Sequence, residues 1–258
     1  GPVDPALALV GPKADSVAIA QVRQQYGLDQ PLYVQYARYL SHLLRGDLGQ
    51  SFYFRQPVRE ALFAKLPATA LLALSIIVVA SLLGIMLGTI AALRNGSLLD
   101  RGLMILQTLS VSLPTFFAGL LLIYFLAFRL KWFPIGGYGT LRHLVLPTLA
   151  VAVPWSAWYG IVLRSSMLDV ISMDYVRTAQ AKGLSGRVIA WRHMLRNAML
   201  PVVTMIGVDL ASLLTGIALV ERVFNLPGIG WQTLEAAIRL DIPMIMGSVL
   251  FGALLIGV

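Results

Sequence analysis

The sequence predicts an all-α protein that crosses a membrane several times. Of its 258 residues, 58% are hydrophobic and only 12% are charged, whereas a soluble domain carries about a quarter charged residues. No charged residue occurs between Lys65 and Arg94 or between Arg101 and Arg129. About 20 consecutive uncharged, mostly apolar residues are enough for a helix to cross the hydrocarbon core of a bilayer. Composition and these two long uncharged runs together define a polytopic membrane protein.

Hydropathy predicts five spans, and the chain is treated as a transmembrane domain from residue 66 to 258. The predicted spans are 67–93, 102–128, 144–163 and 198–220, with a fifth that begins near Ile242 and is still apolar at Val258. The sequence has no initiator methionine and its last span is short, so we expect further membrane-embedded sequence beyond both ends.

Residues 1–65 are polar enough to lie outside the bilayer. Five apolar residues recur there at helical spacing, namely Tyr33, Tyr36, Leu40, Leu43 and Leu44. They predict an amphipathic helix that starts near Pro31 and stops at Gly46. Its tyrosines suit a membrane interface, and ordinary packing against the spans is the alternative. A second, short helix is predicted from Pro57 into the span at Pro67.

The charges in the loops orient the spans. Loops 94–101 and 164–197 share one side and hold eight Lys or Arg residues, whereas loops 129–143 and 221–241 hold five. Cytoplasmic loops carry the excess of basic residues. This bias places loop 164–197 in the cytoplasm and segment 1–65 on the external side.

The sequence lacks the motifs of several other function classes. It contains no cysteine, so a disulfide framework, a cysteine zinc site and a thiol nucleophile are excluded. It has no Gly-x-x-x-x-Gly-Lys-Ser/Thr motif, and the glycines of Gly228-Ile229-Gly230 are interpreted as a turn. The three histidines, His42, His143 and His193, lie far apart and form no local metal motif. The net charge of +8 lies in loops between spans. We therefore expect no enzyme activity, metal, cofactor or nucleic-acid partner for this chain.

One acid, Asp209, lies well inside a predicted span. Ionisable residues in a membrane are costly and usually face a cavity or a partner. Two interpretations stay open: Asp209 lines a translocation path, or it makes a structural hydrogen bond to a neighbouring helix or subunit.

The stretch DYVRTAQAKGLSGRVIAWRHMLRNAMLP, residues 174–201, is basic and patterned as two short helices. Asp174 is a predicted cap of the first helix, on which Tyr175, Val176 and Ala179 share one side and Arg177 and Gln180 point away. Gly183 permits a sharp turn at low steric cost. Ser185 is a predicted cap of the second helix, on which Val188, Trp191 and Leu195 form an apolar face beside Arg192, His193 and Arg196.

Physical reasoning leaves two interpretations of this helix–glycine–helix loop open. An amphipathic basic loop adheres to anionic lipid, so membrane lipid is one expected partner. A fixed turn between two helices also suits docking into a groove on a soluble protein.

The stretch YVRTAQAKGL…RHMLRNAMLPVV resembles the cytoplasmic EAA loop of binding-protein-dependent ABC importer permeases. More narrowly, it is similar to the dipeptide/oligopeptide/nickel group. The segments DPALALVGP…VRQQYGLDQPLYVQYARYL…LLRGDLGQSF and VERVFNLPGIGWQTLEAAIRLDIPMIMG resemble the region after the family's first span and its last external loop. Two positions depart from the general EAA pattern: Arg177 replaces an acid, and Arg196 replaces a proline.

The resemblance implies the type I permease fold of an ABC importer, with five of an expected six spans visible. It implies a multi-pass protein of the bacterial cytoplasmic (inner) membrane whose loop 164–197 holds the coupling helix. The implied partners are a second homologous permease subunit, two ATPase subunits that bind ATP and Mg²⁺, and an external solute-binding protein. No cofactor is implied for this chain itself.

The resemblance and the loop pattern together give candidate site residues. The ATPase-docking candidates are Tyr175, Val176, Arg177, Thr178, Ala179, Gln180, Ala181, Lys182, Gly183 and Leu184, supported by Arg192, His193, Arg196 and Asn197. Asp209 is the translocation-path candidate, and Asn225, Pro227, Gly228 and Gly230 are candidates for an external gate.

We expect the function to be ATP-driven import of di- or oligopeptides. Nickel chelates, glutathione and other small solutes are the alternatives for this group. An ion-coupled secondary transporter, with Asp209 binding the coupling ion, is the rival mechanism.

Overall fold

The computed structural model describes Ala20 and residues 29–257, and these residues form helices joined by short loops. The part of segment 1–65 that covers 1–19 and 21–28, and the end of the last span at Val258, lie outside the described residues. Within the described part there is no strand, only an isolated bridge between Gln50 and Pro57. The elements in chain order are α3 (Leu32–Leu44), α4 (Val58–Leu93), α5 (Leu98–Val111), α6 (Thr115–Leu122), η1 (Ile123–Arg129), α7 (Leu141–Ile171), α8 (Asp174–Ala181), α9 (Gly186–Val188), η2 (Ile189–Met194), α10 (Leu195–Ala198), α11 (Leu200–Leu214), α12 (Ala218–Val223), α13 (Ile229–Ile238) and α14 (Ile242–Gly257).

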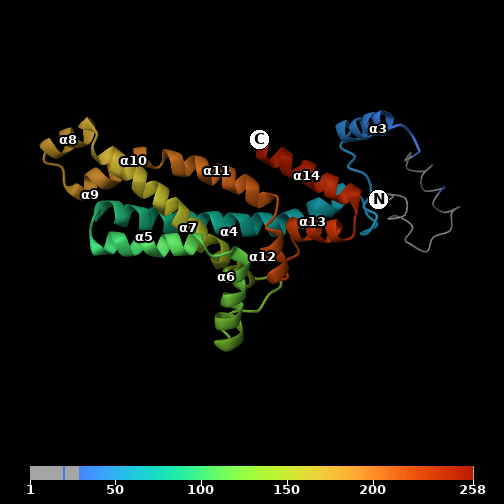
Figure 1. Cartoon of the computed structure of the whole chain (residues 1–258), viewed down its shortest axis with the longest axis horizontal. Helices are drawn as coiled ribbons and strands as arrows, with labels where there is room; N and C mark the ends of the chain where they lie inside the picture. Colours follow the sequence, from blue (N-terminus) through green and yellow to red (C-terminus); the bar gives the residue numbers. More distant parts are fainter. Residues whose placement is uncertain (1–19, 21–28, 258) are drawn as a thin grey trace.

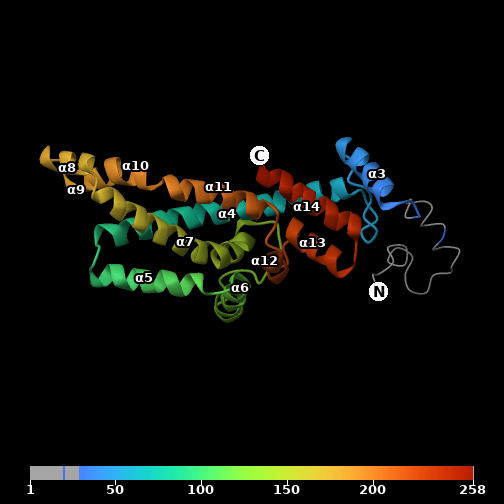
Figure 2. The same ribbon diagram turned by 45° about the horizontal axis from the view of Figure 1, so that its top comes forward.

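Helices α4, α5, α7 and α11 run along the length of the molecule (Figures 1 and 2). Helices α8 and α9 lie at one end of this bundle, and α3, α13 and α14 lie toward the other end (Figure 1). The predicted cytoplasmic loop and the predicted external segments are thus separated along the long axis.

The core of the bundle is the contact between α4 and α7. A Cβ atom added at Gly84 would lie 2.7 Å from the Cβ of Tyr159, and one added at Gly88 would lie 2.6 Å from the carbonyl oxygen of Gly160. Small residues at such positions let two helix backbones approach closely, which is how membrane helices gain packing energy. Tyr159 and Leu163 are completely buried at this contact.

Among the described residues, α4 and α7 are each long and apolar enough to cross a membrane alone. Up to four helical units meet this test if two bent pairs each count as one span, namely α5 with α6–η1 and 189–198 with α11. Residues 242–255 of α14 form a shorter apolar helix. All five predicted apolar segments are therefore helical, and the predicted all-α polytopic class is confirmed.

The span predicted over 102–128 is not one straight helix, because the chain bends by 99° between α5 and α6–η1. Helix α5 ends at Val111, and Pro114 lies directly before the first residue of α6. Proline has no backbone N–H and restricts the residue before it, here Leu113, to extended conformations. As a result α6 leaves the bundle sideways (Figure 1).

Two further boundaries differ from the predictions. The span predicted over 198–220 stops at Leu214, and the chain turns at Gly216, where φ is +97°. The short helix predicted from Pro57 into the span at Pro67 is present, but no boundary divides it from the span: it is the first part of α4, which continues through Pro67. Proline is tolerated inside membrane helices because neighbouring groups satisfy the freed carbonyl.

The amphipathic helix predicted after Pro31 is confirmed as α3, and Gly46 follows it with φ of +76°. Among its residues, all of which are described, none is buried. Tyr33 and Tyr36 are 75% and 66% exposed, so the structure does not support the alternative in which these side chains pack against the spans.

Candidate functional site

The first helix of loop 164–197, α8, places its small apolar residues inward. Val176 and Ala179 are buried, whereas Arg177 and Gln180 are exposed, as the sequence predicts. The predicted cap was wrong: Met173 occupies the N-cap position, and Asp174 is the first helical residue. Asp174 instead lies 3.7 Å from Arg177 in an exposed ion pair. The carboxylate in the first turn still favours the positive helix N-terminus.

Gly183 ends α8 in a left-handed conformation with φ of +76°. The amide of Gly183 donates to the carbonyl of Gln180, and the amide of Leu184 donates to that of Ala179. Glycine is the usual residue at this position after a helix, because a side chain is strained at positive φ. The predicted sharp turn is thus present, and it requires glycine at position 183 because the backbone there has a positive φ.

The second helix of the loop buries a different face from the one predicted. Ser185 is at the N-cap position, as predicted, and Leu195 is buried. Val188 and Trp191 are 40% and 55% exposed, and the buried side chains are instead Ile189, Ala190 and Met194. Residues 189–194 form a π-helical segment. Its wider turn shifts the inward face relative to the regular 3.6-residue period that the prediction assumed.

The two helices of the loop are tied together by Tyr175 and Asn197. The side-chain amide of Asn197 donates to the Tyr175 hydroxyl oxygen over 2.8 Å. The Tyr175 hydroxyl in turn lies 3.5 Å from the carbonyl oxygen of His193, to which it donates. Arg192 and Arg196 remain exposed beside this contact. The proposed docking and support residues therefore form one local unit.

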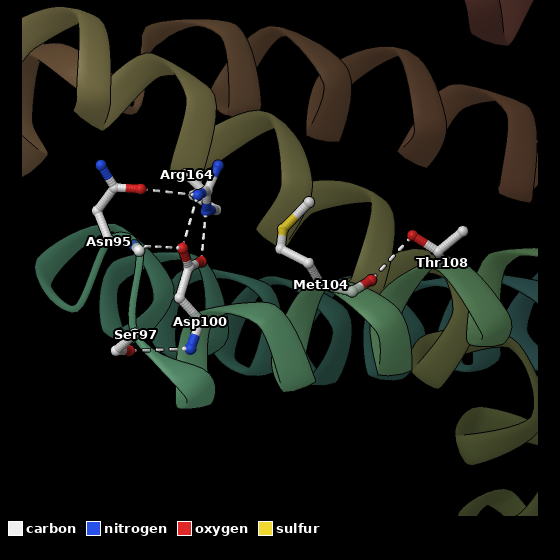
Figure 3. A network of polar contacts seen from close by, with 7 residues as sticks. Asn95, Ser97, Asp100, Met104, Thr108 and Arg164 are labelled. Carbon is white, nitrogen blue, oxygen red and sulfur yellow. Dashed lines mark hydrogen bonds and ion pairs between the residues drawn. The ribbon is translucent and has the colours of Figure 1, made fainter.

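A network at the turn between α4 and α5 was not predicted from the sequence. The Arg164 guanidinium donates to both carboxylate oxygens of Asp100, over 2.6 and 2.7 Å, and to the side-chain oxygen of Asn95 over 2.9 Å. Figure 3 shows Arg164 reaching from α7 to Asp100 at the start of α5. Asp100 is buried and also accepts from the amide of Gly96. This bidentate pair fastens the α4–α5 turn to α7.

Asp209 lies beside a cavity of about 390 Å³ at the bend between α5 and α6. The lining includes Leu113, Pro114 and Thr115 of the bend, Trp155, Trp158 and Tyr159 of α7, and Asp209 of α11. The Tyr159 hydroxyl donates to the Asp209 carboxylate over 2.7 Å. The hydrogen bond to a neighbouring helix agrees with the structural interpretation of Asp209. The cavity beside Asp209 is the feature that the translocation-path interpretation needs.

Two of the four candidates for an external gate, Gly228 and Gly230, lie beside a buried carboxylate that sequence reasoning missed. Glu221 of α12 is completely buried, and it accepts hydrogen bonds from the Thr69 hydroxyl over 2.9 Å and from the amide of Trp231 over 2.7 Å. Thr69 in turn accepts from the amide of Ile229 over 2.9 Å. These amides belong to the first turn of α13, whose free N–H groups and positive dipole favour an anion.

The glycines of this region are explained by the same carboxylate and by backbone contact. Gly228 is the N-cap of α13, and a Cβ atom there would overlap the Glu221 carboxyl group. A Cβ atom on Gly230 would lie 2.7 Å from the amide nitrogen of Ala218. Gly228-Ile229-Gly230 therefore opens a helix, and its interpretation as a simple turn was wrong. Asn225, with φ of +52°, and Pro227 lie in the connection before α13.

Burial raises the pKa of the Glu221 carboxyl group above its usual range. Its hydrogen bonds, from Trp231, Thr69 and Gly230, act in the opposite direction but are the smaller effect. The groups that face this carboxyl are donors, so they suit its ionised form.

A third buried acid, Asp241, connects the loop after α3 to the start of α14. It accepts hydrogen bonds from the Ser51 hydroxyl and from the amides of Phe52 and Tyr53. Across the part of the chain that the structure describes, no group of three or more His, Cys, Asp or Glu residues is arranged to hold a metal ion. The buried acids are therefore placed as hydrogen-bond acceptors between elements.

These features define the class: a polytopic helical membrane protein with a largely apolar cavity that contains one acid between its helices, and a structured loop at one end. The family model described as "Binding-protein-dependent transport system inner membrane component" matches residues 84–258. The model of the N-terminal part of such components matches residues 1–73. The chain belongs to this family of binding-protein-dependent inner-membrane transport components, as the EAA-loop resemblance predicted.

Similar proteins agree with this assignment. A "probable peptide ABC transporter permease protein" of Sinorhizobium fredii is 38% identical over 252 residues, which cover 95% of this chain and 80% of the relative. A "glutathione transport system permease protein" of Salmonella paratyphi A is 41% identical over 253 residues, covering 98% and 83%. A crystal structure of "an amino acid ABC transporter with histidines" matches with a TM-score of 0.52 and 16% identity over 76% of this chain and 92% of that chain. At this identity the structural match shows the fold alone.

The chain is thus a multi-pass permease subunit of an ABC importer in the inner membrane, and it is not itself an enzyme. Membership of this family implies association with ATPase and binding-protein partners. It also favours the ATP-coupled mechanism over the ion-coupled carrier.

Proposed function

We propose that this chain is one of two membrane subunits of an importer for small peptides, and that residues 175–184 are its contact with the ATPase. An external binding protein delivers the cargo to the face formed by 1–65, 129–143 and 221–241. A second, homologous permease subunit completes the path, and two ATPase subunits bind ATP and Mg²⁺. This chain binds no cofactor of its own and no nucleic acid.

The cargo proposal rests on the relatives. One is named as a peptide permease and another as a glutathione permease, at similar identity and coverage. Glutathione is itself a short peptide with a free amino group and free carboxyl groups. Di- or oligopeptides and glutathione are therefore equally compatible with these names, and we propose the class of small peptides that includes both.

The observation that carries the coupling proposal is the fixed geometry of α8. Its inward residues, Val176 and Ala179, are buried, and Tyr175 is hydrogen-bonded to Asn197 of α10. A loop that only adheres to lipid by charge does not need these specific contacts, whereas a docking element does. Arg177 and Gln180 remain exposed for a partner.

The same contacts give a path for motion. Helix α10 continues through Met199 into α11, with a 51° bend between the two parts. A displacement of α8 therefore acts on α11, which carries Asp209. For ATP to shift the transporter between its states, α8 must make different contacts with the ATPase in each state.

The test uses the assembled importer and measures cargo-stimulated ATP hydrolysis. Arg177→Glu reverses a charge that is exposed in this chain, and Gly183→Pro and Ala179→Arg alter the turn and the inward face. We expect each to uncouple hydrolysis from cargo in complexes that still assemble. Leu98→Arg, which adds a charge at an exposed position in the α4–α5 region, is the control and should remain coupled. Unchanged coupling in an assembled Arg177→Glu complex, together with unchanged coupling in Gly183→Pro, would reject the docking assignment.

A further inference from the structure

The cavity beside Asp209 has an acidic group in its described lining without a basic group to balance it. Its described lining contains one acid and no basic residue. Two tryptophans of α7, Trp155 and Trp158, contribute aromatic surface to the same wall, and most of the remaining lining is apolar. An apolar cavity with a few convergent polar groups is the usual form of a small-molecule site.

Asp209 has acceptor capacity that the protein does not use. An ionised carboxylate has about four acceptor positions, and Tyr159 donates to one oxygen, Oδ2. Among the ion pairs of the described residues, none includes Asp209. A charge in a membrane span is expensive unless it is paired or faces a polar cavity. The other oxygen of Asp209 is therefore suited to a cation that enters the cavity.

Tyr159 holds this carboxylate in place. The tyrosine is completely buried, with its Cβ against Gly84 of α4, so its ring has little freedom to move. Its hydroxyl donates to Asp209 across the contact between α7 and α11. Tyr159 is thus a positioning residue, whereas Asp209 faces the cavity.

We propose that this cavity binds the primary ammonium group of the cargo during translocation, with Asp209 as its counter-ion and Trp155 and Trp158 as its aromatic wall. Aromatic faces attract cations, more strongly where water is excluded. This inference rests on the proposed function, because it takes the small-peptide class as cargo. It holds for peptides and glutathione alike, since both carry a free primary ammonium group. The site binds the ammonium group and does not discriminate between the side chains of different cargo peptides.

The test is a two-by-two comparison of binding. The assembled importer, without its binding protein, is placed in lipid nanodiscs, and equilibrium dialysis measures the affinity for trialanine and for N-acetyl-trialanine. Hydrogen bonds to charged groups contribute about 1.5–3 kcal/mol, so Asp209→Asn should weaken trialanine binding by roughly tenfold or more. N-acetylation should weaken binding to the wild type by a similar factor. The two changes should not add, because they remove the same interaction.

Two variants complete the comparison. Asp169→Asn removes an exposed carboxylate of α7 outside the cavity and should leave both affinities unchanged. Tyr159→Phe should weaken trialanine binding by a smaller factor than Asp209→Asn and leave the acetylated probe unaffected. A purely structural role for Tyr159 would instead weaken both probes equally.

The inference is overturned if the wild type binds neither probe, if it binds both equally, or if Asp209→Asn weakens both by the same factor. ATP-driven uptake of peptide into proteoliposomes, with the binding protein present, tests the proposed function separately. Uptake without probe discrimination rejects the ammonium site alone. Probe discrimination that depends on Asp209, without peptide uptake, rejects the proposed cargo and retains the site.

Discussion

Glu221 and Asp209 are both acids among largely apolar helices, but their surroundings differ. Glu221, beside the start of α13, is completely buried and accepts hydrogen bonds from Thr69 and from the amide of Trp231. Asp209, near the middle of α11, is partly buried and lines a cavity. Its hydrogen bond comes from Tyr159 alone among the contacts of the described residues.

The difference separates an architectural acid from one that is available to a ligand. A buried carboxylate surrounded by fixed donors joins the elements that supply them, here α4, α12 and α13. A carboxylate with unused acceptor positions beside a cavity contributes little to the stability of the fold, and it remains able to bind a cation. Asp100, which is paired with Arg164 and accepts a hydrogen bond from the backbone amide of Gly96, belongs with Glu221. Variants that disturb Glu221 or Asp100 should therefore lower stability, whereas variants at Asp209 should lower ligand binding.

The largest loss of stability is expected from Arg164→Ala. This change leaves the buried Asp100 carboxylate without its bidentate partner and should lower the free energy of unfolding by roughly 3 kcal/mol. Arg94→Ala, which removes an exposed arginine near the same turn, is the matched control and should have little effect. Thermal unfolding of the purified assembly measures both. Equal losses of stability from the two variants would mean that the Asp100–Arg164 pair does not stabilise the protein more than an exposed arginine does.

Glu221→Gln should follow, with a loss of about 2 kcal/mol. The glutamine keeps the size of the side chain but turns one acceptor into an NH₂ donor that faces other donors. Glu235→Gln on the same α13 is the control, because Glu235 makes weaker, partly exposed ion pairs with Arg222 and Arg239. The prediction fails if thermal unfolding shifts as much for Glu235→Gln as for Glu221→Gln.

Two Gly→Ala changes should have opposite signs. At Gly228 the added methyl group overlaps the Glu221 carboxyl group, so overpacking should destabilise the protein by about 1–3 kcal/mol. At Gly102, inside α5, the described atoms leave open space around the new methyl group, and alanine should stabilise the helix by roughly 0.5–1 kcal/mol. Thermal unfolding gives both signs, and destabilisation at Gly102 would contradict this account of the packing.

The smallest change in stability is expected from Asp209→Asn. The amide oxygen of asparagine still accepts the hydrogen bond from Tyr159, so the free energy of unfolding should change by less than about 1 kcal/mol. The same variant should lose affinity for the free-amino probe. A loss of stability as large as that of Glu221→Gln would place Asp209 among the architectural acids.

Local patterns in the sequence predicted much of this protein. Long apolar runs depend only on neighbouring residues, and they identified all five apolar segments. The helix start near Pro31, the glycine turn at Gly183 and the inward positions Val176 and Ala179 also follow from local propensity and period. The inward face of the second loop helix could not be predicted, because the π-helical turn over 189–194 changes the period on which the prediction depends.

The remaining features depend on tertiary structure. The sequence marked Asp209 as unusual, but only folding places it 2.7 Å from a tyrosine 50 positions earlier and beside the 99° bend at Pro114. The burial of Glu221 could not be predicted from the sequence, because some of its hydrogen-bond donors are backbone amides, which every residue except proline possesses. By itself, the sequence determined the helical class, the order of the spans and the family. The tertiary structure decided which acids are saturated with donors and which one faces a cavity, because hydrogen-bond saturation depends on groups that are distant in sequence.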